Sequence, residues 1–84
     1  MNLGKHLLLE VYDGTFQQLN DHIFLKDILF DGIQKSKSTI LNCFIHKFNP
    51  QGCTILFALA ESHVSCHTWP EKGCLTADFY TCGD

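Results

Sequence analysis

The chain has 84 residues, a net charge of -3 at pH 7 and 45% hydrophobic residues. This length accommodates a single domain, residues 1–84, and so small a domain buries little surface, so we expect a partner subunit. The acidic balance, with six lysines and no arginine, argues against a nucleic-acid-binding module, which requires a basic surface.

The sequence predicts a location in the cytoplasm. The N-terminal segment "MNLGKHLLLEVYDG" has neither the long apolar region nor the small-residue cleavage site of a signal peptide. The longest apolar run, residues 55–60, is far too short to cross a membrane. Five cysteines cannot all pair within one chain, so free thiols are expected.

The first half of the chain predicts a strand and a helix. Residues 6–12, "HLLLEVY", form a nearly continuous apolar run, which suits a mostly buried strand. Residues 13–15, "DGT", predict a turn. In residues 20–35 the apolar side chains recur at helical spacing, and Asn20 or Asp21 can cap the start of that helix.

The second half predicts three strands. Residues 38–48 are rich in β-branched and aromatic side chains, and "NPQG" at 49–52 is a turn sequence. Residues 53–60 have apolar or small side chains on both faces, which predicts a central strand. Residues 61–73 are more polar and predict a connection, and residues 74–82 predict the last strand.

This order of elements predicts an α+β fold. The expected architecture is a two-layer α/β sandwich, with a mainly antiparallel sheet and the helix packed on one face. One helix covers only part of one face of such a sheet. We therefore expect that further chain or a partner covers the rest.

The segment "LAESHVSCHTWPEKG" contains the candidate chemistry, and zinc is the first alternative. His63 and His67 stand four residues apart, with Cys66 between them, and on a helix such a spacing can hold zinc. However, the segment is a poor helix former, and the HExxH, CxxC and CxxCH patterns are absent. No metal site is therefore predicted.

Nucleophilic catalysis by a serine or a cysteine is the second alternative. Ser62 does not have the flanking glycines of a GxSxG nucleophile elbow. Cys82 together with a histidine can form a thiol nucleophile. A lone cysteine near the end of a strand is more often a small hydrophobic residue.

Self-processing is the third alternative. A serine hydroxyl can attack the carbonyl before it and turn the amide into an ester, and β-elimination followed by hydrolysis then leaves a pyruvoyl group. The reaction needs a serine at a strand-to-loop junction, a histidine that transfers protons and a group that stabilises the oxyanion. Glu61-Ser62, with His67 five residues later, fits this pattern. From spacing alone, an ordinary serine at the end of a strand remains the better-supported interpretation.

Four segments carry a resemblance to a known family: "LGKHLLLE", "HKFNPQG", "AESHVSCHTWPEKG" and "FYTCGD". In this order they resemble the small prokaryotic class of S-adenosylmethionine decarboxylase proenzymes. The resemblance implies autocatalytic cleavage between residues 61 and 62, with Ser62 converted into the pyruvoyl cofactor. It also implies decarboxylation of S-adenosylmethionine for spermidine synthesis by a cytoplasmic homodimer, without nucleic acid or membrane partners.

The resemblance assigns roles to further residues by motif. His67, in "HTWPE", matches the histidine implicated in processing, and Cys82, in "TCGD", matches the catalytic acid. Phe48 matches an aromatic residue that packs against adenine, and Glu71 matches a carboxylate at the nucleoside end of the pocket. Thr54 matches a hydroxyl position that assists processing and is usually a serine.

The sequence departs from the family pattern in two ways. The family usually continues past "TCGD" through another helix and strand, so we expect this chain to represent a shortened domain. Cys53, Cys66 and Cys74 replace apolar or aromatic residues, and we expect these thiols to pack as small hydrophobic groups. Two functional alternatives remain open: the same chemistry on ornithine or arginine, and a non-catalytic homologue that stays unprocessed.

Overall fold

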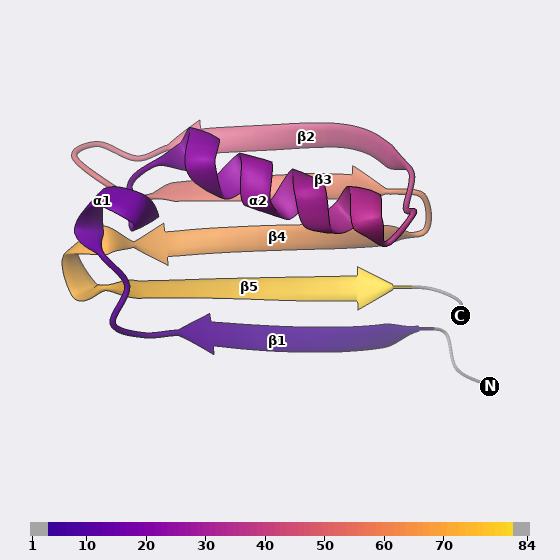
Figure 1. Ribbon diagram of the computed structural model, residues 1–84, viewed down its shortest axis with the longest axis horizontal. Helices are drawn as coiled ribbons and strands as arrows, with labels where there is room; N and C mark the ends of the chain where they lie inside the picture. Colours follow the sequence, from indigo (N-terminus) through magenta and orange to yellow (C-terminus); the bar gives the residue numbers. More distant parts are fainter. Residues whose placement is uncertain (1–3, 82–84) are drawn as a thin grey trace.

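The computed structural model describes residues 4–81 (Figure 1). The elements are β1 (Lys5–Val11), α1 (Phe16–Leu19), α2 (His22–Lys35), β2 (Ile40–Lys47), β3 (Cys53–Leu59), β4 (Ser62–Trp69), the 3-10 helix η1 (Pro70–Lys72) and β5 (Cys74–Thr81). The five strands form one sheet in the order β1-β5-β4-β3-β2, and every neighbouring pair is antiparallel. The predicted α+β, two-layer architecture is confirmed.

Helix α2 forms where the sequence predicts it. The side chain of Asp21 caps its start by accepting a hydrogen bond of 3.0 Å from the backbone N–H of Phe24. Leu25 and Ile33 are buried against the sheet, so the helix is held by its apolar face. The single-turn helix α1, capped by Thr15, was not predicted because one turn is too short to show a periodic pattern. Within residues 4–81, no helix is long and apolar enough to cross a membrane.

The prediction of a polar connection over residues 61–73 is wrong. Most of this segment is β4, the central strand of the sheet, and β3 lies beside it in the sheet interior. In β4 the side chains of Val64 and Cys66 point to the core, whereas those of His63 and His67 point to the other face. The polar side chains therefore belong to one face of a strand and do not indicate a loop.

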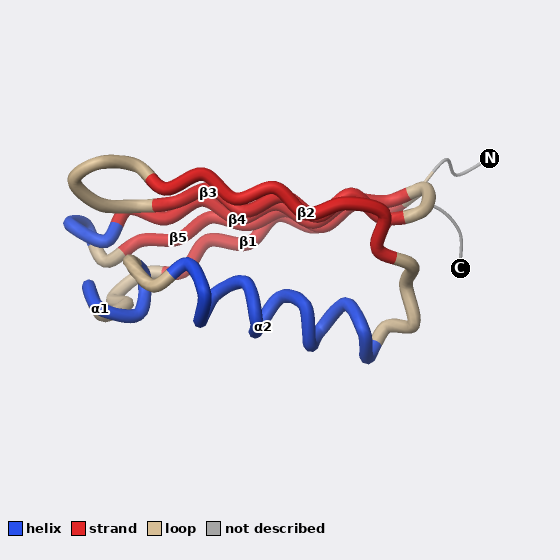
Figure 2. The backbone as a smooth tube through the Cα atoms, turned by 90° about the horizontal axis from the view of Figure 1, so that it is seen from above, coloured by secondary structure: helices blue, strands red, loops and turns tan. Residues whose placement is uncertain are grey.

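The predicted burial of the first strand is also wrong. Every residue of β1 is exposed, and Leu8 has 71% of its surface accessible. β1 is an edge strand, and α2 lies over the side of the sheet that contains β2, β3 and β4 (Figures 1 and 2). An apolar run indicated a strand correctly, but burial depends on what covers that strand.

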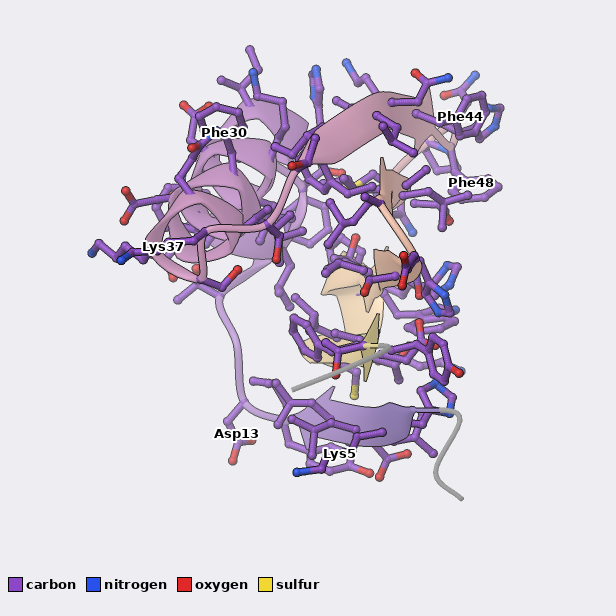
Figure 3. The ribbon with its side chains drawn as sticks, turned by 90° about the vertical axis from the view of Figure 1, so that its right-hand side faces the viewer. Lys5, Asp13, Phe30, Lys37, Phe44 and Phe48 are labelled. Atoms are coloured by element: carbon purple, nitrogen blue, oxygen red, sulfur yellow. The ribbon has the colours of Figure 1, made fainter. Side chains whose placement is uncertain are left out.

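The core lies between α2 and one face of the sheet. Its buried side chains include Ile55 and Phe57 of β3, Val64 and Cys66 of β4, and Leu25 and Ile33 of α2. The opposite sheet face has no covering layer among residues 4–81, and Phe44 and Phe48 project from that side (Figure 3). We call it the open face; its members include His6, Thr54, His63, His67 and Asp78.

Candidate active site

A tight hairpin between β3 and β4 contains the bond that the sequence marks for cleavage. Leu59 pairs with Ser62, so Ala60 and Glu61 form a two-residue loop. Glu61 has a φ of +64°, in the left-handed region that costs a residue with a side chain about 1–2 kcal/mol. Ser62 is the first residue of β4. The Glu61–Ser62 peptide bond therefore joins a strained loop residue to the start of a strand.

A pocket of about 230 Å³ lies near the other end of β4. Its lining residues are Phe48, Gln51, Cys53, Thr54, His67, Thr68, Trp69 and Glu71. Four predicted site residues, Phe48, Thr54, His67 and Glu71, thus meet in one cavity although they come from separate parts of the sequence. The sequence assigned no role in the site to Gln51 or Trp69. Their positions in the sequence could have revealed both, because Gln51 lies three residues after Phe48 and Trp69 lies two residues before Glu71.

Thr54 and His67 form a hydrogen-bonded pair within this pocket. They lie directly opposite each other on β3 and β4, and Thr54 Oγ1 is 2.9 Å from His67 Nδ1. The contact fixes the orientation of the imidazole and leaves its second nitrogen for proton transfer. The indole of Trp69 is close to the same ring, with 6.4 Å between the ring centroids. This arrangement suits a histidine that acts as a general acid or base.

The structure separates His67 from Ser62 within one chain. The two residues are five positions apart on an extended strand, which corresponds to about 17 Å. Because side chains alternate along a strand, they also point to opposite faces. The five-residue spacing suggested that the histidine lies close to the serine, and within one chain it does not.

Cys82, predicted as the catalytic acid, lies outside the described residues. The residue before it, Thr81, ends β5 and pairs with Ser62 of β4. The structure therefore places Thr81 beside the hairpin that contains the Glu61–Ser62 bond.

Comparison with known proteins identifies the family. Residues 5–84 match the family model described as S-adenosylmethionine decarboxylase. The chain belongs to the S-adenosylmethionine decarboxylase family. It is 48% identical over 82 residues to the S-adenosylmethionine decarboxylase proenzyme of Prochlorococcus marinus (strain MIT 9313), an alignment that covers 98% of this chain and 66% of the relative.

Other S-adenosylmethionine decarboxylases agree with this assignment. The proenzyme of Clostridium tetani is 41% identical over 83 residues, which cover 99% of this chain and 66% of the relative. The crystal structure of the adenosylmethionine decarboxylase from Aquifex aeolicus VF5 matches with a TM-score of 0.90 and 34% identity, covering 98% of this chain and 68% of that chain. This chain therefore spans about two thirds of the length of these curated relatives.

In this member of the S-adenosylmethionine decarboxylase family, His63, Cys66 and His67 do not converge. Cys66 is buried on the core side of β4, whereas both histidines lie on the open face. Burial, and to a lesser extent the neighbouring Cys53, raises the pKa of the Cys66 thiol to about 12. Cys66 is therefore a protonated core residue. It does not form a zinc site with His63 and His67.

A second polar cluster on the open face surrounds Asp78. Its carboxylate oxygen Oδ2 lies 2.7 Å from His6 Nε2 and 2.9 Å from His63 Nε2, and Ser65 donates a hydrogen bond to Oδ1. Burial alone raises the pKa of Asp78, but the hydrogen bonds from Ser65, His63 and His6 outweigh it and hold that pKa well below its usual range. The sequence did not reveal this cluster because its members are far apart along the chain.

Proposed function

We propose that this chain is a pyruvoyl-dependent S-adenosylmethionine decarboxylase that cleaves itself between Glu61 and Ser62. The observation that carries the proposal is the position of this bond, directly after a left-handed residue in a two-residue hairpin of a chain from this family. Backbone strain of this kind costs about 1–3 kcal/mol and concentrates at sites of chemistry.

Cleavage follows from the chemistry of Ser62 itself. Its Oγ attacks the carbonyl carbon of Glu61, the amide nitrogen leaves, and an ester replaces the peptide bond. Loss of the α-proton then breaks the Cβ–Oγ bond, which releases the Glu61 carboxylate and leaves dehydroalanine. Water then hydrolyses the dehydroalanine, so that its nitrogen leaves as ammonia and a ketone remains, which is the pyruvoyl group. Each step moves a proton, which is the role that we propose for His67, oriented by Thr54.

The pyruvoyl group at position 62 supplies an electron sink for the loss of carbon dioxide from the substrate. The remaining task for the chain is to return a proton to the substrate α-carbon, and we assign this step to the thiol of Cys82. General acid catalysis of this kind contributes about a hundredfold to ten-thousandfold to the rate.

The pocket beside His67 supports a nucleoside substrate. Phe48 and Trp69 line it and remain 51% and 40% exposed, so their ring faces are accessible to adenine and to the sulfonium cation. Glu71 places a carboxylate in the same cavity, where it can accept hydrogen bonds from ribose hydroxyls. We propose that Phe48 packs against the adenine and that Glu71 binds the nucleoside end.

The separation of Ser62 from His67 supports a homodimer in which two copies build each site. A twofold axis near the middle of β4 places the Ser62 end of one copy beside the His67 end of the other. Such packing also covers exposed apolar side chains on the open face, such as Leu8, Phe44 and Leu56. We further propose that this dimer acts in the cytoplasm and supplies the aminopropyl donor for spermidine.

Substrate turnover tests the proposal. Purified chain is incubated separately with S-adenosylmethionine, ornithine and arginine, each labelled at its carboxyl carbon, and the release of labelled carbon dioxide is measured. We expect release from S-adenosylmethionine alone and none from the Ser62→Ala variant, which cannot form the cofactor. Release from ornithine or arginine but not from S-adenosylmethionine contradicts the substrate assignment.

A further inference from the structure

The Asp78 cluster joins three neighbouring strands on the open face. His6 of β1 and His63 of β4 both pair with Tyr80 of β5, which lies between them, and Asp78 is two residues before Tyr80 on the same face. The two imidazoles approach each other edge to face across β5, with 6.1 Å between their ring centroids. Their Nε2 atoms and a carboxylate oxygen of Asp78 all lie within 4.8 Å of one another.

We propose that His6, His63 and Asp78 form a binding site for a divalent transition-metal ion such as Zn²⁺. Two histidines and one carboxylate are a ligand set that zinc accepts, and three protein ligands leave a coordination position for water. The ligands come from strands of one sheet, so their relative positions are set by the backbone hydrogen bonds of that sheet.

Neighbouring residues hold each ligand in place. Ser65 donates a hydrogen bond to Oδ1 of Asp78, which leaves Oδ2 directed at the two imidazoles. The ring of Tyr80 stacks on His63 at 5.8 Å with an interplanar angle of 21°, and it contacts His6 edge-on at 6.1 Å. The hydrogen bond from Ser65 is of the kind that orients a carboxylate ligand in known metal sites.

A metal ion fits after a small local change. At tetrahedral zinc distances the ligand atoms stand about 3.3 Å apart, whereas His6 Nε2 and Asp78 Oδ2 are now 2.7 Å apart. Each imidazole must therefore move about half an ångström away from Oδ2, and the two Nε2 atoms, which lie within 4.8 Å of each other, must come to the same separation of about 3.3 Å. Both histidine side chains are 48% exposed within one chain, so the chain itself leaves room for this movement. Through His6 and His63, the bound ion would connect the edge strand β1 to the start of β4.

Titration with Co²⁺ tests this site, because Co²⁺ follows Zn²⁺ in its ligand geometry and absorbs visible light. The chain carries Ser62→Ala, so that its covalent state is uniform and the result does not depend on the proposed decarboxylase activity. It is treated with a chelator and then titrated. We expect one Co²⁺ per chain, a tetrahedral ligand-field band and none of the ultraviolet absorption of a cobalt–thiolate bond. Competition with Zn²⁺ should remove the visible band.

Histidine variants identify the ligands. His6→Gln and His63→Gln should each weaken binding of Co²⁺ about tenfold or more, because each removes one of three ligands. His22→Gln, at the start of α2, should bind as tightly as the unaltered site. Circular dichroism checks that each variant keeps its fold. The proposal is overturned if no Co²⁺ binds, if thiolate absorption appears, or if the double variant His6→Gln/His63→Gln binds normally.

Discussion

At the scale of single residues, the hydrogen bond between Thr54 and His67 is the feature closest to the proposed chemistry. It joins two strands within the pocket and fixes one nitrogen of the imidazole. A histidine that transfers protons depends on this orientation, because proton transfer requires a donor and an acceptor within hydrogen-bond distance.

Removing the hydroxyl of Thr54 should slow self-cleavage. Thr54→Val keeps the shape of the side chain but cannot form the hydrogen bond to His67. We therefore expect cleavage to slow about tenfold or more, which is part of the hundredfold to ten-thousandfold that general acid–base catalysis contributes. Thr54→Ser keeps the hydroxyl and should cleave at a rate close to that of the original chain. The cleaved fraction is followed by mass spectrometry over time. Equal rates for the valine and serine variants would assign the contact to packing alone.

Buried and exposed cysteines should differ sharply in reactivity. Cys66 is buried and its thiol has a pKa of about 12, so almost none of it is thiolate at pH 8. Iodoacetamide should therefore modify the exposed Cys43 in the folded chain and reach Cys66 only after unfolding in urea. Peptide mapping locates the label. Equal labelling of both residues without urea would contradict the described core.

At the scale of elements, the sequence predicted α2 well because its cap and its apolar spacing are local signals. The sequence also predicted strands near β1, β2, β3 and β5. It missed β4 because five of the eight side chains on this central strand are polar, three of them on the open face, which gave the composition of a loop. The family motifs marked Phe48, Thr54, His67 and Glu71, and the structure brings these four residues to one pocket. The distance between Ser62 and His67 depends on the extended course of β4, which the sequence did not predict.

The loop between β3 and β4 should prefer glycine at position 61. In the left-handed region a β-branched residue is strongly disfavoured, whereas glycine fits without strain. In the Ser62→Ala background, Glu61→Gly should therefore exceed Glu61→Val in free energy of unfolding by about 1 kcal/mol or more. Urea unfolding measures both values. A more stable valine variant would show that residue 61 has an ordinary extended backbone.

At the scale of the whole molecule, the account rests on two copies that share each site. One chain has Ser62 at one end of β4 and His67 near the other, and the open face between them is uncovered within residues 4–81. A shared site explains both observations and predicts a dimer.

Complementation between two inactive variants tests this shared site. Ser62→Ala and His67→Ala should each fail to cleave when produced alone. Produced together, they form mixed dimers in which one site combines Ser62 of one copy with His67 of the other, so about a quarter of the normal number of sites should form. Fragments of the His67→Ala chain, detected by mass, report this cleavage. Absence of those fragments from confirmed mixed dimers would place both residues in one chain.

The central claim is that the chain converts Ser62 into a pyruvoyl group, and intact-mass spectrometry of the purified protein tests it most directly. The account predicts two fragments, residues 1–61 and 62–84, and the second should be lighter by one ammonia than the same fragment with an N-terminal serine. The Ser62→Ala variant should remain whole. Persistence of the full-length chain, or a second fragment that begins with an unmodified serine, would contradict the account.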